Sequence, residues 1–128
     1  MGNGKKKLGE AELEIMQVIW ASKTPVTSNY ILQELQGLRA WKLSTLMTSL
    51  ARLADKGFVS CDRSCGSNLY APLVEEDAYK TAESKSFLEK LYGNSIQNMV
   101  ATLYCNRALK SSDVEELRKF LDELEEGL

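Results

Sequence analysis

The sequence predicts a mainly α-helical protein with one small β-hairpin, and three observations support that prediction. Apolar residues recur at helical spacing over most of the 128 residues. A proline after the first such segment and a glycine after the third mark where helices end. Two short apolar stretches, near 58–61 and 69–71, flank a polar turn that contains Gly66. Three helices followed by a hairpin is the order of a winged helix-turn-helix.

The N-terminal helices are expected over about 8–22, after Thr27 or Ser28, and over about 41–56. Thr24-Pro25 ends the first helix, because proline cannot continue the hydrogen-bond ladder. Thr27 or Ser28 is suited to cap the second helix, and Gly57 is suited to end the third. The inner face of the second helix is predicted to hold Ile31, Leu35 and Leu38. The inner face of the third helix is predicted to hold Leu43, Leu46, Leu50 and Leu53.

Three further helices are predicted after Val74, which divides the chain into a winged-helix DNA-binding domain (8–74) and a helical dimerisation domain (75–128). Gly93-Asn94 and Ser111-Ser112-Asp113 supply the break and the caps between these helices. Each helix has an apolar face but no evident closed core, so a second copy of the chain is the economical partner. The residues expected at that interface are Phe87, Leu91, Ile96, Met99, Val100, Leu103, Val114, Leu117, Leu121 and Leu124.

Composition excludes several classes of function. The chain contains no histidine, which removes the commonest general base and zinc ligand, so we predict neither an enzyme nor a cofactor. No apolar run approaches the roughly 20 residues of a membrane span, and no signal peptide opens the chain, so a cytoplasmic protein is expected. The net charge of −2 combines +3 over residues 1–74 with −5 over 75–128, and we therefore expect any polyanion to meet the N-terminal part.

The third helix is the candidate DNA-reading element. On a helical wheel, its small hydroxylated side chains lie roughly opposite its leucines. Such side chains let the backbone approach a major groove and can bond phosphates or base edges. An alternative is that the module binds protein, since this helix carries few basic residues. The candidate DNA-binding residues are Trp41, Lys42, Ser44, Thr45, Thr48, Arg52 and, in the hairpin turn, Arg63.

Three cysteines allow a second alternative. Cys61 and Cys65 flank the hairpin turn, where a thiol or soft-metal sensor could alter DNA affinity. The plainer interpretation is two chance cysteines in a tolerant turn, and two thiols without histidine make a poor zinc site, so no metal site is predicted. Cys105 is expected to be buried in an apolar face.

Three stretches together resemble the penicillinase-repressor family, which includes β-lactamase and methicillin-resistance repressors and copper-responsive relatives. The first is LGEAELEIM at 8–16, continued by VIW at 18–20. The second is similar to the family's W-S-x-K-T-V-x-T-L-L-x-R-L-x-x-K-G, and it contains Trp41, Thr45, Thr48, Leu50, Arg52-Leu53 and Lys56-Gly57. The third is SFLEKLYG at 86–93. The resemblance covers about residues 8–126 with the elements in the same order.

The resemblance implies a cytoplasmic homodimeric repressor whose winged helix binds a pseudo-palindromic operator of an antibiotic-resistance or stress operon. In the resistance systems, a sensor-protease pathway cleaves the C-terminal domain at an Asn-Phe pair. Thr102-Leu103 stands at the equivalent position, so an inducing protease is not predicted by the residues present. Ser44 and Met47 replace basic residues of many relatives, which implies a different operator sequence. The C-terminal cysteine cluster of the copper-responsive relatives is missing from Val114–Leu128.

Overall fold

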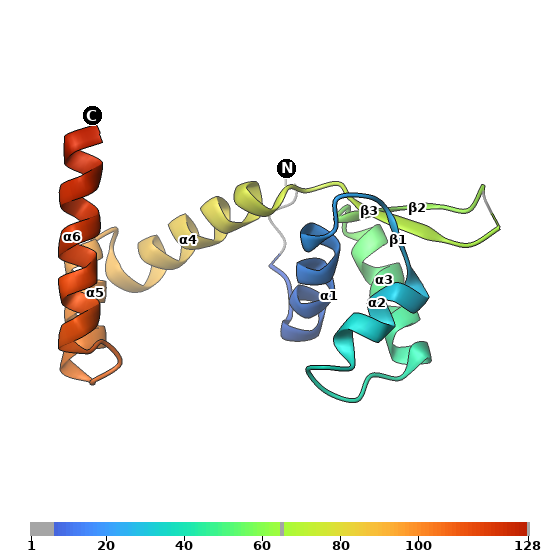
Figure 1. Cartoon of the computed structure of the whole chain (residues 1–128), viewed down its shortest axis with the longest axis horizontal. Coiled ribbons are helices and arrows are strands. Elements are labelled where there is room, and N and C mark those ends of the chain that lie inside the picture. Colours follow the sequence, from blue (N-terminus) through green and yellow to red (C-terminus); the bar gives the residue numbers. More distant parts are fainter. Residues whose placement is uncertain (1–6, 65, 128) are drawn as a thin grey trace. The chain divides into compact units, whose positions relative to one another are not determined.

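The computed structural model describes residues 7–64 and 66–127. The predicted order of three helices, a hairpin and three helices is confirmed (Figure 1). The elements are α1 (Glu10–Ala21), β1 (Val26–Thr27), α2 (Ser28–Leu35), α3 (Leu43–Asp55), β2 (Val59–Asp62), β3 (Leu69–Pro72), α4 (Glu76–Tyr92), α5 (Ile96–Cys105) and α6 (Ser111–Gly127). None of the described helices is long and apolar enough to span a membrane.

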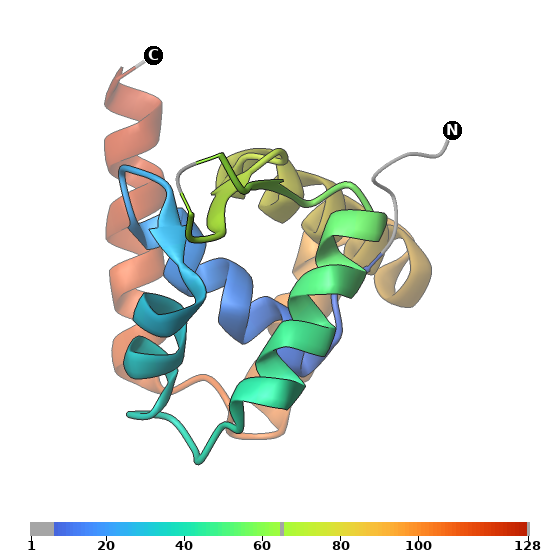
Figure 2. The ribbon, with the colours of Figure 1, turned by 90° about the vertical axis from the view of Figure 1, so that its right-hand side faces the viewer.

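The first unit of the fold is built on apolar faces of α1, α2 and α3, which surround one core (Figure 2). Helical spacing places these faces as predicted, because residues three and four apart share one side of a helix. The side chains from these helices that are at most 1% exposed are Ile15, Met16, Ile19, Ile31, Leu35, Leu46, Leu50 and Leu53. Phe58 and Val59 extend the core from α3 to the sheet.

The sheet has three antiparallel strands in the order β1-β3-β2, one more than the sequence indicated. The hairpin of β2 and β3 is confirmed, with Cys61 opposite Tyr70. The unpredicted strand, β1, pairs Val26 with Tyr70 and Thr27 with Leu69. Two residues are too few to show the alternation by which a strand is recognised in a sequence.

The predicted start of α2 and the predicted end of α3 are confirmed. The Tyr30 N–H donates to the Thr27 Oγ1 at 3.1 Å, which caps α2. Gly57 has φ +85°, a conformation that side chains with a Cβ rarely adopt, and the chain leaves α3 there. The Thr27 cap thus fixes the start of α2, and Gly57 fixes the end of α3.

Three placements on α2 and α3 differ from the predictions. Leu38 is 64% exposed because α2 ends at Leu35, three residues earlier. Leu43 is 47% exposed although its angle on the wheel matches the leucine stripe, because it lies in the first turn of α3. Ser49 takes a buried place beside Leu46 and Leu50 instead.

The division between the two compact units falls between Glu83 and Ser84, within α4, and not at Val74/Glu75 as expected. The start of α4 belongs to the first unit because Tyr79 packs there. Its ring centroid lies 5.8 Å from those of Trp20 and Phe58, and its hydroxyl accepts a hydrogen bond from the Leu8 N–H at 2.9 Å. Burial raises the pKa of the Tyr79 hydroxyl above its ordinary value.

A carboxylate in α1 connects the start of the first helix to the end of the third. Glu12 Oε1 accepts from the Gly9 N–H at 2.9 Å and from Lys56 Nζ at 2.7 Å, and Glu12 is 9% exposed. Burial raises the pKa of the Glu12 carboxyl, but the bonds from Lys56 and Gly9 and the nearby charges outweigh it and lower the pKa. The ionised form therefore stabilises the fold.

We predict that Glu12→Gln lowers the free energy of unfolding at pH 7 by about 1–3 kcal/mol, the range for a charged hydrogen bond. A lowered pKa in the folded state adds stability above the unfolded carboxyl's pKa and loses it as the pH falls through the folded value. Urea unfolding along an acid series checks this, with the exposed Glu10→Gln as control. A difference from wild type that stays constant with pH would contradict it.

Candidate nucleic-acid interface

The side of α3 turned away from the core is exposed and carries mostly small hydroxyl groups. Ser44, Thr45 and Thr48 are exposed, as is Arg52 in the last turn. We call these four residues the hydroxylated face of α3. Lys42, at the N-cap, is also exposed. The structure thus brings five of the seven predicted DNA-binding residues onto or beside one helix surface.

The hydroxyl groups on this face are not equivalent. Thr48 Oγ1 donates to the Ser44 carbonyl oxygen at 3.0 Å, one turn earlier in the helix. Its proton is therefore used within α3, and Thr48 offers outward only an acceptor and a methyl group. Ser44 and Thr45 lie in the first turn, the part of such a helix from which base contacts come.

Trp41 does not share this exposed surface, so its predicted outward placement is wrong. The side chain precedes α3 and is 7% exposed within the core of the first unit. Its Nε1–H donates to Glu14 Oε1 at 3.3 Å, and its carbonyl oxygen accepts from Gln36 Nε2 at 3.1 Å. A helical wheel gave the wrong orientation because Trp41 lies before the helix begins.

The same contacts hold the connection between α2 and α3. The Arg39 Nε donates to Glu14 Oε1 at 3.2 Å, and its Cζ lies 5.2 Å from the Trp41 ring centroid. Glu14 thus accepts from both Arg39 and Trp41. Beside them is a hollow of about 470 Å³ lined by Ala11, Arg39, Ala40, Trp41, Lys42 and Thr45. Arg39 could not be predicted from the sequence, because no helical period extends into this connection.

The hairpin places Arg63 in the exposed turn after β2, as predicted. The neighbouring Asp62 carboxylate accepts from the Ser64 N–H at 2.9 Å, and this bond lowers the pKa of Asp62. The carboxylate shapes the start of the turn in the manner of an Asx-turn. Arg63 therefore lies in a turn that the Asp62–Ser64 hydrogen bond organises, at the tip of the β2–β3 hairpin, the wing of the fold.

The described cysteines do not add support for a thiol or metal sensor. Cys61 is half-buried on β2 and free, whereas Cys65 lies outside the described residues. No cluster of three cysteine, aspartate or glutamate ligands occurs among the described side chains. Cys105 is exposed, contrary to the expected burial, because α5 has no covering element on that side within the described chain.

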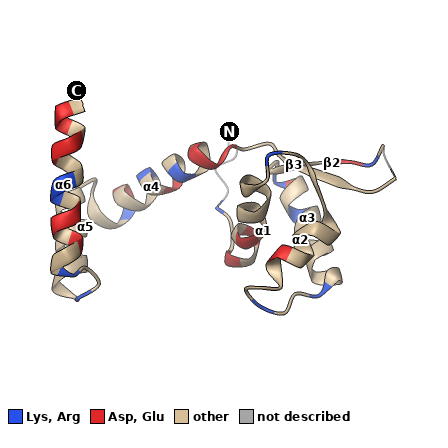
Figure 3. Cartoon of the chain, viewed as in Figure 1, with Lys and Arg blue, Asp and Glu red and all other residues tan. Residues whose placement is uncertain are grey.

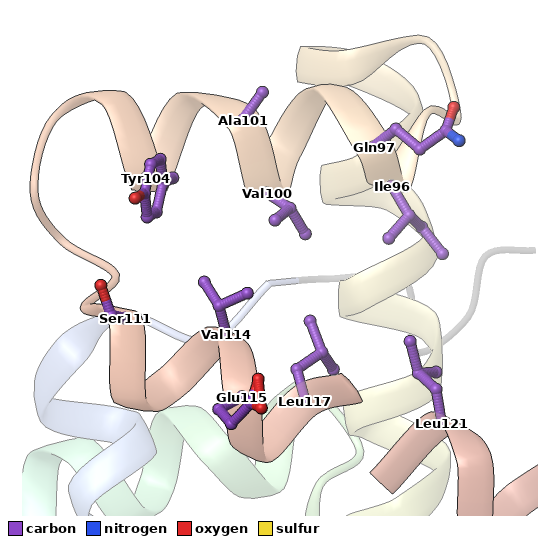
Figure 4. A pocket seen from close by; sticks show the side chains of 10 residues that line it. All are labelled: Ile96, Gln97, Val100, Ala101, Tyr104, Ser111, Val114, Glu115, Leu117 and Leu121. Atoms are coloured by element: carbon purple, nitrogen blue, oxygen red, sulfur yellow. The ribbon is translucent and has the colours of Figure 1, made fainter. Parts of the chain in front are cut away.

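The second unit has apolar side chains but no buried residue among those described. Of the predicted interface residues, Phe87, Leu91, Ile96, Leu121 and Leu124 are between 47% and 64% exposed. Between α5 and α6 lies a groove of about 720 Å³ (Figure 4). Figure 4 shows the apolar side chains of the two helices facing one another across it, namely Ile96, Val100, Val114, Leu117 and Leu121.

The two residues expected to correspond to a cleavage pair lie inside a helix. Thr102 and Leu103 belong to α5, and the Thr102 hydroxyl donates to the Asn98 carbonyl oxygen at 2.9 Å. Both residues are exposed in the single chain.

Three packed helices, a three-stranded antiparallel sheet and an exposed third helix define a winged helix-turn-helix protein. The sequence profile of the penicillinase repressor family matches residues 8–123. This chain therefore belongs to the penicillinase repressor family, whose members are transcriptional repressors and not enzymes.

Two relatives show the extent of the similarity. The methicillin resistance regulatory protein MecI of Mammaliicoccus sciuri is 33% identical over 122 residues, which cover 95% of this chain and 98% of the relative. The penicillinase repressor of Staphylococcus aureus is 31% identical over 124 residues, which cover 97% of this chain and 98% of the relative.

Two solved structures each match more than half of this chain. The DNA-binding domain of the repressor BlaI is 32% identical, with a TM-score of 0.51 over 57% of this chain and 88% of that one. Bacillus licheniformis BlaI, solved as a monomer with the blaP half-operator, is 31% identical. The match has a TM-score of 0.50 and covers 58% of this chain and 89% of that one.

Because the Trp41 indole is buried, we expect its N–H to contribute to stability. Trp41→Phe removes the N–H that donates to Glu14, and we expect the free energy of unfolding to fall by about 1–2 kcal/mol. Urea unfolding measures this, with Tyr30→Phe as a control on a side chain that is 42% exposed. Unchanged stability together with lost DNA affinity would show instead that the indole itself contacts DNA.

Proposed function

We propose that this chain is a homodimeric transcriptional repressor that binds a pseudo-palindromic operator through α3 and the β2–β3 hairpin. The observation that carries the proposal is the exposed hydroxylated face on the third helix of a winged helix-turn-helix. A relative with the same fold was solved with a half-operator, which supports the same use of this surface. The proposed target is an antibiotic-resistance or stress operon, and the names of the relatives favour antibiotic resistance.

The size of the side chains on α3 suits entry into a major groove. A major groove about 12 Å wide accepts a helix, and short side chains allow its backbone to approach the base edges. In such a complex Ser44 and Thr45 meet bases or phosphates from the first turn. Lys42 and Arg52 lie on either side of them along the chain and meet the phosphate backbone, while Arg63 on the wing meets a flanking phosphate or the minor groove.

The charge on this surface sets the expected salt dependence. From Leu43 to Asp55, α3 carries only Arg52 and Asp55 as charged residues, and most of the helix is uncharged in Figure 3. With three cations per subunit in contact with phosphate, the slope of log affinity against log salt is about −5 for a dimer. A recognition helix of this composition relies on contacts other than charge for its specificity.

The dimer is proposed from the exposed apolar faces of the second unit. Apolar side chains at 114, 117, 121 and 124 follow a 3-4-3 spacing along α6, the spacing of a helix-packing seam. Covering such faces with a second copy removes this apolar surface from water, at about 25 cal/mol per Å². A two-fold dimer presents two copies of α3, which matches operator half-sites near one helical turn, or a multiple of it, apart.

We predict that Thr45→Val weakens operator binding by about 1–3 kcal/mol, the range for losing a polar contact to a base. Valine keeps the shape and the β-branch and removes only the hydroxyl. Fluorescence anisotropy with a dyad operator selected from random duplexes measures the loss, and Thr24→Val, at an exposed threonine outside α3, serves as control.

The same titration separates this function from a protein-binding module. Wild-type protein that shows no preference for the selected dyad over random duplex at physiological salt would contradict operator binding. An affinity of Thr45→Val for the selected dyad equal to that of wild type would remove Thr45 from the contact set.

A second prediction concerns the dimer. Leu121→Glu places a charge on a side chain that lines the α5–α6 groove and is 52% exposed, so we expect dissociation at micromolar concentration. Sedimentation velocity measures the mass, and Lys119→Glu, which also adds negative charge but lies away from the α6 seam, is the control. Wild-type protein that sediments as a monomer would contradict the proposal.

A further inference from the structure

The exposed surface of α3 has an apolar side as well as a hydroxylated one. Leu43, Met47 and Ala51 are spaced four residues apart and so form one row along the helix, which we call the apolar row. Leu43 is 47% exposed and Ala51 is exposed, whereas Met47 is half-buried against the core. The row follows the hydroxylated face over the first two turns of α3.

Leu43 lies at the end of the apolar row that is nearest to the proposed base contacts. It is the first residue of α3, next to Ser44 and Thr45, from which the proposed base contacts come. A helix that enters a groove with its N-terminal part forward brings its first turn closest to the base edges. Leu43 is therefore placed where the proposed interface is deepest.

The chemistry of the row limits what it can recognise. The long basic side chains that read guanine through O6 and N7 are missing from the first two turns of α3. Thr48, between the row and Arg52, has its hydroxyl proton bound to the Ser44 carbonyl oxygen. The one apolar group that a base pair presents in the major groove is the C5-methyl group of thymine.

We propose that Leu43, with Met47 beside it, determines operator specificity by contacting thymine C5-methyl groups in each half-site. The inference rests on the proposed operator binding and names the base that this chain reads. Leu43 is a contact residue in this account, and the apolar row stands in place of a basic reading surface.

Deoxyuridine tests this directly, because it keeps thymine's base pairing and lacks only the C5-methyl group. The probe is a dyad duplex selected by the protein, with each thymine of the half-sites replaced in turn by deoxyuridine. For a contacted thymine, we expect wild-type affinity to fall about fourfold, as for exposing one buried methyl-sized group. The proteins compared are wild type, Leu43→Ala and Leu73→Ala, the last a matched change at another exposed leucine, outside α3.

The inference predicts that Leu43→Ala binds the thymine and deoxyuridine duplexes equally, whereas Leu73→Ala keeps the wild-type ratio. Since Leu43 is exposed, its variant is expected to keep the wild-type unfolding midpoint, which circular dichroism checks. Equal binding of both duplexes by wild type, or a ratio that persists in Leu43→Ala, would overturn the inference while leaving operator binding intact. No preference for the selected dyad over random duplex would instead overturn the proposed function on which it rests.

Discussion

Burial of one stripe on α3 fixes the surface that this protein presents to a partner. Leu46, Leu50 and Leu53 are at most 1% exposed, and together they set the rotation of the helix about its axis. Once that rotation is set, the hydroxylated face turns outward, and the apolar row lies at its border, with Leu43 and Ala51 exposed and Met47 half-buried against the core. The Glu14 contacts to Arg39 and Trp41 then fix the connection that leads into α3. Packing within the core therefore decides which side chains of α3 are exposed for the proposed contact with DNA.

The second unit depends on a different constraint, because none of its described residues is buried in the single chain. Its helices begin and end at clear signals, such as the Ser95 hydroxyl that accepts from the Asn98 N–H. Helices of this kind gain most of their stability from packing an apolar face. The groove between α5 and α6 shows that one chain leaves much of that face uncovered. Dimerisation would thus stabilise this unit and pair two DNA-reading helices at once.

The fold could be predicted from helical spacing, caps and turn residues, because these signals are local. The errors arose where a residue's environment depends on neighbouring elements. Trp41 and Leu43 were assigned by their angles on a wheel, which does not show where a helix begins or which neighbours cover its first turn. Strand β1 was too short to detect, and Cys105 is exposed on a helix without a covering neighbour. In the candidate site, Arg39 was missed for the same reason, since only the folded chain brings it to Glu14 and Trp41.

In the proposed complex, two copies of one outward-facing helix read DNA across a two-fold axis. A hydroxyl-radical footprint of the full-length protein on its selected operator tests this most directly, since it maps backbone contacts on both strands. We expect two protected patches related by the dyad, with centres one helical turn or a multiple of it apart. A single patch without symmetry, or uniform weak protection along the duplex, would contradict it.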